Sequence, residues 1–361
     1  MIRLVVIIAV LAAVARPCAA TEDAVALARA GTAAIERGRF GDALTAFTRA
    51  AELRPDDSSM CFGAGVAAFM LGQDDVARTR FECALARNPA SVPAATWLAD
   101  LHYRAGRLSD AIAVYEALGR HSAKAAELQQ QIDLLRKEDA LQRRFTSVRS
   151  DHFIAHFEAA GDAPLAREVV DRLEAAYARI GKTLGSHPAQ PITVVLYTRE
   201  QFNDITRLSS WSVAAYDGRI RIPLGLTLAQ PEELDRLLSH EFVHAVVTKL
   251  GGRAVPAWVN EGLATVLEPA GSKDVEAVLD RTGDGPALSK LHRSFVGLSV
   301  RDAEVAYASA ARAVRRLIEQ HGTSAVVALL KDLSQGAPFD DAFQKRMAMR
   351  YEDFESLVAR K

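Results

Sequence analysis

The spacing of apolar and polar residues changes along the chain near residue 145. Before that point, apolar positions recur every three or four residues, which is the period of an amphipathic helix. Beyond it, residues 152–157 alternate as in a strand, residues 165–184 return to helical spacing, and residues 192–197 form a β-branched run typical of a buried strand. The pattern predicts a helix-rich protein of α+β class.

The N-terminal third repeats itself with a period of 34 residues, because Gly38, Gly72 and Gly106 are equally spaced. Two further sets of residues keep the same spacing: Ala43, Ala77 and Ala111, and Phe47, Phe81 and Tyr115. A glycine between two helical stretches allows a tight turn, and small residues allow helices to pack closely. The register resembles the tetratricopeptide repeat, an α-solenoid, in three copies over residues 21–123.

An amphipathic stretch over residues 124–145 follows the repeats and is predicted to cap them, with Leu128, Ile132 and Leu135 on one face. Stacked repeats usually offer a concave surface to a protein or peptide partner. A rigid spacer is the alternative for this region, and the residues alone favour neither.

The second part of the chain combines short strands with helices. Residues 213–216 and 219–223 are strand-like and are joined by Asp217 and Gly218, which predicts a hairpin with a two-residue turn. A long helix is predicted from Pro231 to the glycines at 251–252, with acidic residues in its first turn.

This helix carries the pattern HExxH, formed by His240, Glu241 and His244. Four residues advance about 400° around a helix, so both imidazoles project from the same face. Two neutral imidazoles at this separation can hold a zinc ion, and Glu241 lies beside them as a potential base. The alternative is a pair of surface histidines with an incidental glutamate.

A catalytic zinc needs a third protein ligand, and residues 256–264 offer one in Glu261, on a predicted second helix after a glycine-rich reversal. The HExxH pattern followed by P-x-W-x-x-E-G-x-A resembles the gluzincin metallopeptidases, and most closely their bacterial peptidase MA-like domains. The resemblance covers residues 146–361 and implies a zincin-like domain with one Zn²⁺ bound by His240, His244 and Glu261. It also implies that Glu241 takes a proton from the attacking water and returns it to the leaving nitrogen.

Other site residues are less settled by the sequence. Many gluzincins carry Asp where this chain has Thr265, so the residues that orient the ligating imidazoles must come from elsewhere. The resemblance suggests Tyr307 as the donor to the developing oxyanion, with His292 as the rival and a purely structural tyrosine as the alternative. It also suggests residues 218–223 as an edge strand that pairs with substrate, although a strand that only completes the sheet fits as well.

Charge and the N-terminus bear on partners and location. The chain has 44 basic and 45 acidic residues, so no basic excess points to nucleic acid.

A signal peptide is predicted over residues 1–20, from Arg3, an apolar run at 4–14 and small residues ending at Ala20. The run is about half the roughly 20 residues that span a bilayer, so we expect cleavage and no stable membrane span. An exported chain could oxidise Cys61 and Cys83, or both could stay free thiols.

The sequence therefore predicts an exported zinc metallopeptidase, periplasmic or secreted, that acts on a peptide or protein substrate and has a possible protein partner on its repeats. A non-catalytic repeat scaffold of the cell envelope, with a structural or silent zinc site, is the alternative.

Overall fold

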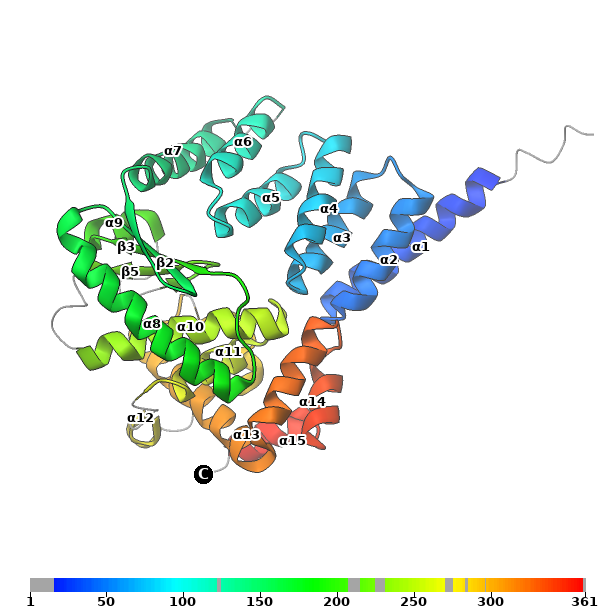
Figure 1. Ribbon diagram of the computed structural model, residues 1–361. Coiled ribbons are helices and arrows are strands. Elements are labelled where there is room, and N and C mark those ends of the chain that lie inside the picture. The colour runs from blue at the N-terminus through cyan, green and yellow to red at the C-terminus, as the bar shows by residue number, and fades with distance from the viewer. Residues whose placement is uncertain are drawn as a thin grey trace, which may run out of the picture.

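A computed structural model gives the fold of the protein (Figure 1) and describes residues 16–121, 125–206, 215–224, 231–269, 275–282, 285–295 and 297–359. The apolar run of the predicted signal peptide, at 4–14, lies outside these residues. Within the described part of the chain, no helix combines the length and the apolar character needed to cross a membrane.

Six helices form the N-terminal solenoid as three successive pairs. They are α1 (Arg16–Glu36), α2 (Phe40–Leu53), α3 (Ser58–Met70), α4 (Asp74–Arg87), α5 (Val92–Arg104) and α6 (Leu108–Gly119). The turn within each pair contains one of the glycines spaced by 34 residues, and their φ angles of +69°, +74° and +74° at Gly38, Gly72 and Gly106 are left-handed. Glycine adopts this conformation without the steric cost of a Cβ atom, which explains why a glycine recurs at the turn of each repeat.

The predicted capping helix is α7 (Ala125–Gln142). Leu128, Ile132 and Leu135 are buried in one cluster with residues of α5 and α6, as the spacing of these three residues predicts.

A mixed five-stranded sheet begins the C-terminal part, in the order β1-β2-β3-β5-β4. The strands are β1 (Thr146–Arg149), β2 (Phe153–Phe157), β3 (Ile192–Tyr197), β4 (Ala215–Tyr216) and β5 (Ile220–Pro223). β2, β3 and β5 run parallel, while β1 and β4 pair antiparallel at the edges. The predicted strands at 152–157 and 192–197 match β2 and β3, whereas the sequence analysis missed β1.

Helices cover both faces of this sheet. One face packs on α8 (Ala163–Leu184) and α10 (Pro231–Gly251) in the main hydrophobic core. The other face packs on α7 and on α9 (Arg199–Thr206), which the sequence analysis also missed. Successive side chains of a strand point to opposite faces, so β5 sends Ile220 and Ile222 into the main core and Arg221 towards α7.

The hairpin differs from its prediction in two ways. Tyr216 pairs with Ile220, so the loop between β4 and β5 has three residues, 217–219, and not two. Gly218 has a φ of +104°, which fits the glycine position of a three-residue loop. The expected edge strand is also wrong, because β5 lies between β3 and β4 and the edge belongs to β4. The predicted strand residues 213–214 lie outside the described residues.

Helices complete the C-terminal part. They are α11 (Ala257–Val266), α12 (Val275–Thr282), the 3₁₀ turn η3 (Leu288–Leu291), α13 (Val300–Ser334), α14 (Phe339–Met347) and α15 (Tyr351–Ala359). α13 is interrupted at Gly322, whose φ of 78° and ψ of 158° are not helical.

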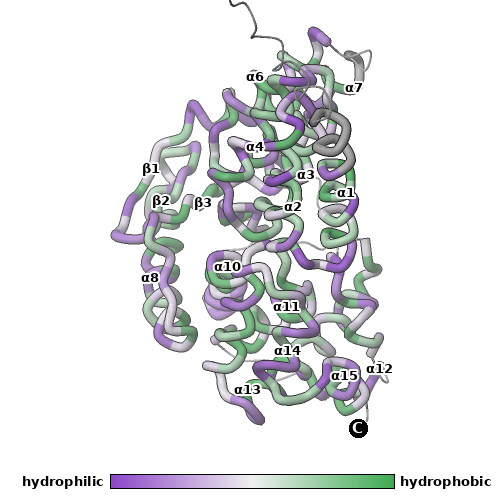
Figure 2. The backbone as a smooth tube through the Cα atoms, turned by 90° about the vertical axis from the view of Figure 1, so that its right-hand side faces the viewer, coloured by the Kyte–Doolittle hydropathy of each residue, from purple (hydrophilic) through white to green (hydrophobic). Residues whose placement is uncertain are grey.

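The turns of the solenoid rest on the C-terminal part. A Cβ atom on Gly252, just after α10, would lie 2.8 Å from the carbonyl carbon of Leu71, so the two backbones touch. Arg253 donates from its backbone N to Met70 O at 2.8 Å, and its guanidinium pairs with Asp74. Gly41 in α2 meets Gly336 beyond α13. The repeats therefore arch over the C-terminal part and contact it near both ends (Figures 1 and 2).

Candidate metal centre

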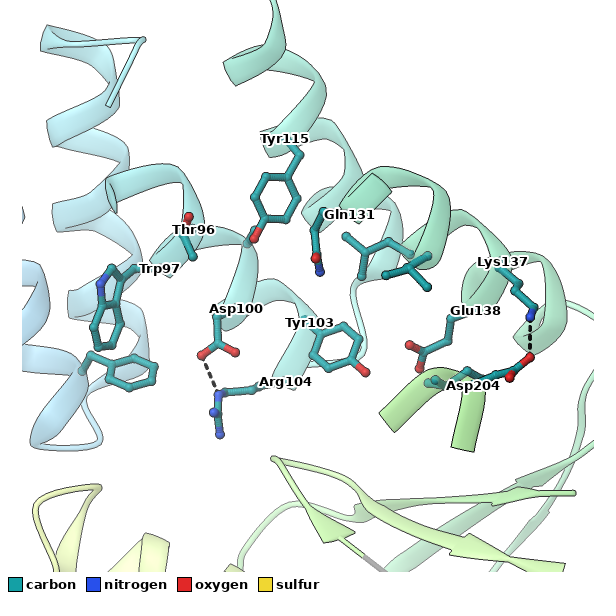
Figure 3. A pocket seen from close by; sticks show the side chains of 15 residues that line it. Thr96, Trp97, Asp100, Tyr103, Arg104, Tyr115, Gln131, Lys137, Glu138 and Asp204 are labelled. Carbon is teal, nitrogen blue, oxygen red and sulfur yellow. Dashed lines mark hydrogen bonds and ion pairs between the residues drawn. The ribbon is translucent and has the colours of Figure 1, made fainter. Parts of the chain in front are cut away.

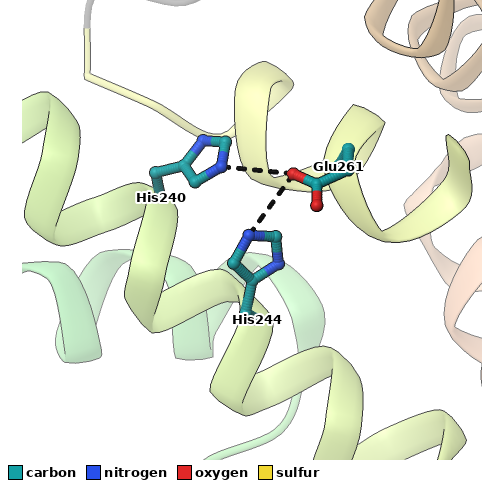
Figure 4. Close-up of side chains that lie close together, drawn as sticks. All are labelled: His240, His244 and Glu261. Carbon is teal, nitrogen blue, oxygen red and sulfur yellow. Dashed lines mark ion pairs between the residues drawn. The ribbon is translucent and has the colours of Figure 1, made fainter. Parts of the chain in front are cut away.

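α10 and α11 place three metal-type ligands together. His240 and His244 lie one turn apart on α10, with ring centroids separated by 4.8 Å. α10 ends at Gly251, and the backbone reverses at Gly252, which has a φ of +70°. This reversal folds α11 back along α10, so that Glu261 faces both imidazoles (Figure 4).

The geometry of the three side chains fits a small tetrahedral cation. Oε2 of Glu261 lies 3.4 Å from Nε2 of His240 and 3.4 Å from Nε2 of His244. Ligands about 2.1 Å from a tetrahedral zinc ion lie about 3.4 Å from one another. Oε2 of Glu261 is also buried without a hydrogen-bond partner among the described residues. An acceptor left in this state is costly, and a bound cation would satisfy it.

Two further side chains orient the imidazoles. Nδ1 of His240 donates to Oε1 of Glu268 at 2.9 Å, and Nδ1 of His244 donates to Oδ1 of Asn260 at 3.0 Å. With the proton on Nδ1, each Nε2 presents its lone pair to the space between the ligands. Glu268 thus occupies the role left open by Thr265, whose hydroxyl donates to the backbone O of Glu261 at 2.9 Å.

The sequence analysis identified neither orienting residue. Asn260 directly precedes Glu261 in the segment 256–264. Its position next to a proposed metal ligand could have marked it as a candidate orienting residue. Glu268 lies beyond the end of α11. Its distance from His240 along the chain follows neither helical nor strand periodicity, so the sequence pattern does not point to it.

Burial shapes the ionisation of these groups. Burial by itself lowers the pKa of His240, but the neighbouring carboxylates of Glu261 and Glu268 outweigh it and raise this pKa to about 10. Burial raises the pKa of Glu241, which is 5% exposed. A metal ion binds the neutral imidazole, so it must displace the proton that the metal-free site holds on His240.

The sequence profile of the Peptidase MA superfamily matches residues 173–357, just over half of the chain. The chain belongs to this superfamily. The tetratricopeptide repeat profile matches residues 28–81 and 71–126. The two matches, in this order along the chain, confirm the resemblance and the helix-rich architecture expected from the sequence.

None of the curated proteins matches the chain. Among solved structures, the repeats are similar to "First TPR of Spaghetti (RPAP3) bound to HSP90 peptide SRMEEVD", at 18% identity and a TM-score of 0.31, over 33% of this chain and 98% of that chain. This likeness is too weak to support a conclusion about function.

Tyr307 and His292 both reach the cleft of the peptidase MA domain. The ring of Tyr307 lies 6.0 Å from that of His240. Burial, together with the charges of Glu261 and Glu241, raises the pKa of Tyr307, so its hydroxyl keeps a proton that it can donate. His292 instead shares a 2.9 Å hydrogen bond with the Tyr351 hydroxyl and packs against Phe339. Of the two, Tyr307 is the one placed against His240.

The other histidines are not assembled for metal binding. Among the described residues, His240, His244 and Glu261 form the group of three or more ligand-type side chains close enough to share an ion. His152 pairs with Glu174 at 2.7 Å and stacks on Tyr177. The histidines that belong neither to the group of His240, His244 and Glu261 nor to the lining of the cleft are His102, His121, His152, His156, His187 and His321.

The cleft over the metal centre has a volume of about 650 Å³ and walls from both parts of the protein. Glu241 and Tyr307 line it, and the β4–β5 hairpin contributes Tyr216. Phe69, Met70 and Arg104 of the repeats line it too; we call these three residues the roof. The repeat domain is thus part of the cleft and not a separate appendage.

Proposed function

We propose that this protein is an exported zinc-dependent metallopeptidase that hydrolyses peptide bonds in the cleft. The observation that carries the proposal is the convergence of two Nε2 atoms on one buried carboxylate oxygen of Glu261, which has no hydrogen-bond partner among the described residues. Membership of the Peptidase MA superfamily supports a peptidase-like activity.

Each side chain has a role in this proposal. His240, His244 and Glu261 would hold one zinc ion, which would supply Lewis-acid polarisation of a substrate carbonyl and of the attacking water. Glu241 accepts the proton of the attacking water and passes it to the leaving amine. Burial raises the pKa of Glu241, and a more basic carboxylate is a better acceptor for the proton of the attacking water. The Tyr307 hydroxyl donates a hydrogen bond to the negative charge that develops on the carbonyl oxygen.

The deciding experiment compares wild type with Glu241→Gln, using zinc analysis and cleavage of a broad peptide library. We expect the variant to keep about one zinc per chain and to lose at least about a hundredfold in turnover, because the base is removed while the ligands stay. Glu232→Gln, at an exposed position in the first turn of α10, is the matched control and should behave as wild type. A zinc-loaded wild type that cleaves nothing in the library would favour the scaffold alternative.

Export is the second part of the proposal. It is supported by the signal-like residues 1–20 and by the disulfide between Cys61 and Cys83, whose Cα atoms lie 5.9 Å apart. Disulfides persist in oxidising compartments. We expect the mature chain to begin at Thr21 and Cys61 and Cys83 to give no thiol signal before reduction. Mass spectrometry that finds Met1 retained, or two reactive thiols at these positions, would contradict export.

A further inference from the structure

A second cavity opens beside the metal cleft, on the repeat domain (Figure 3). It has a volume of about 550 Å³ and runs between α5, α7 and α9. We call it the repeat groove. Phe69 and Arg104 of the roof line both the groove and the cleft, so the two cavities adjoin.

The side chains of the groove suit an apolar segment of polypeptide. Trp97, Tyr103 and Leu134 offer aromatic and aliphatic surface, and none of these three is fully buried. Aromatic rings provide large contact areas for apolar side chains at low entropic cost.

The charged residues that line the groove are all matched within the protein. Asp100 pairs with Arg104 at 2.6 Å, and Lys137 pairs with Asp204 at 2.6 Å. The carboxylate of Glu138 accepts from Arg221 of β5 at 2.8 Å. Neutralised charges give little attraction for a strongly acidic or basic ligand, so the groove selects for apolar content.

The position of the groove relative to the cleft is fixed by buried contacts. Glu138 and Arg221 are 3% and 1% exposed, and the Arg221 guanidinium also lies over the ring of Tyr103, 4.9 Å from its centroid. Arg253, just after α10, contacts the roof as well: its guanidinium lies 4.1 Å from the ring centroid of Phe69. A chain that leaves the cleft past Phe69 and Arg104 therefore enters the groove.

We infer that the repeat groove binds a second segment of the same polypeptide that is cleaved at the metal centre. This inference rests on the proposed peptidase function. A cavity of this size accommodates a ligand of small-molecule dimensions. The cleft, at about 650 Å³, has a similar size and suits a few residues of extended chain. The substrate class is an unfolded or locally unfolded protein with apolar residues at a distance from the cleavage site, and the partner of the repeats is the substrate itself.

The test uses two adjacent glutamines of α7. Gln131 is exposed and lines the groove, while Gln130 is exposed and is not among its lining residues. In protein that begins at Thr21, with Cys61 and Cys83 joined in their disulfide, Gln131→Cys or Gln130→Cys supplies the reactive thiol. Fluorescein maleimide attached after purification then fills the groove from position 131 and leaves it open from position 130. We measure kcat/KM for β-casein, an unfolded chain, and for peptides of about four residues, which extend about 13 Å.

We expect the label at position 131 to lower the ratio of casein cleavage to tetrapeptide cleavage roughly tenfold, as the loss of an anchoring contact would. The label at position 130 should leave the ratio at its wild-type value. Equal ratios for the two labelled proteins would overturn the inference.

A binding experiment separates this inference from the peptidase proposal. Benzophenone maleimide at position 131 or 130, in Glu241→Gln protein, is irradiated with β-casein. Cross-linking at 131 above the level at 130 supports the groove, and equal cross-linking overturns it. If zinc-loaded wild type cleaves neither substrate, the peptidase proposal fails, while the cross-linking result still decides whether the groove binds unfolded chain.

Discussion

Glu268 offers the sharpest test of the metal centre, because only the folded structure points to it. Its carboxylate accepts from Nδ1 of His240 at 2.9 Å and is 9% exposed, so water does not replace it. Replacing Glu268 with Ala leaves His240 free to rotate and lowers its basicity. Residues in this orienting role are worth about 10- to 100-fold in metal affinity, or about 1.4–2.8 kcal/mol. Deep burial places Glu268→Ala near the upper value.

Zinc affinity is measured by competition with a chromophoric chelator, and circular dichroism checks that the variant is folded. Folding should persist because Arg236, the other partner of Glu268, keeps its pair with Glu233. Thr265→Val is the matched control, since this position carries the orienting carboxylate in many gluzincins but here bonds only to the backbone of α11. Folded Glu268→Ala protein with wild-type zinc affinity, or an equal loss in Thr265→Val, would refute the assignment.

Three further predictions test the chemistry and the packing. Tyr307→Phe should lower kcat by about a hundredfold with zinc content retained, because an oxyanion donor is lost; an unchanged kcat would remove Tyr307 from the mechanism. Zinc binding at neutral pH should release about one proton, since His240, whose pKa is raised to about 10, must become neutral. The affinity therefore falls as the pH falls, and calorimetry in buffers of different ionisation enthalpy that finds no release would contradict this. Gly252→Ala should cost at least about 1–2 kcal/mol in urea unfolding, because its φ is +70° and the new Cβ would meet Leu71. Gly119→Ala, where the Cβ position is open, should be close to neutral; equal costs would reject the contact.

The fold could be read from the sequence wherever one local period dominated. The repeat, the capping helix and β2 were predicted from the regular spacing of their side chains, β3 from its β-branched run, and α10 from its first proline, its acidic first turn and the glycines at its end. β1 and α9 were missed because they are short: β1 is mostly exposed at an edge, and α9 has eight residues. The hairpin loop was wrong by one residue, since pairing of β4 with β5 fixes its length and the dipeptide Asp217–Gly218 does not.

What the sequence alone determined is which side chains make up the candidate metal centre. The spacing of His240 and His244 forces both imidazoles onto one face of any helix that contains them, and the 34-residue period forces stacked helix pairs. The tertiary structure alone decided which groups orient the imidazoles and what covers the cleft. Glu268 meets His240, and Phe69 and Arg104 roof the site, only because segments far apart in the chain pack together. No local period encodes such contacts, since they depend on how whole elements fit against one another.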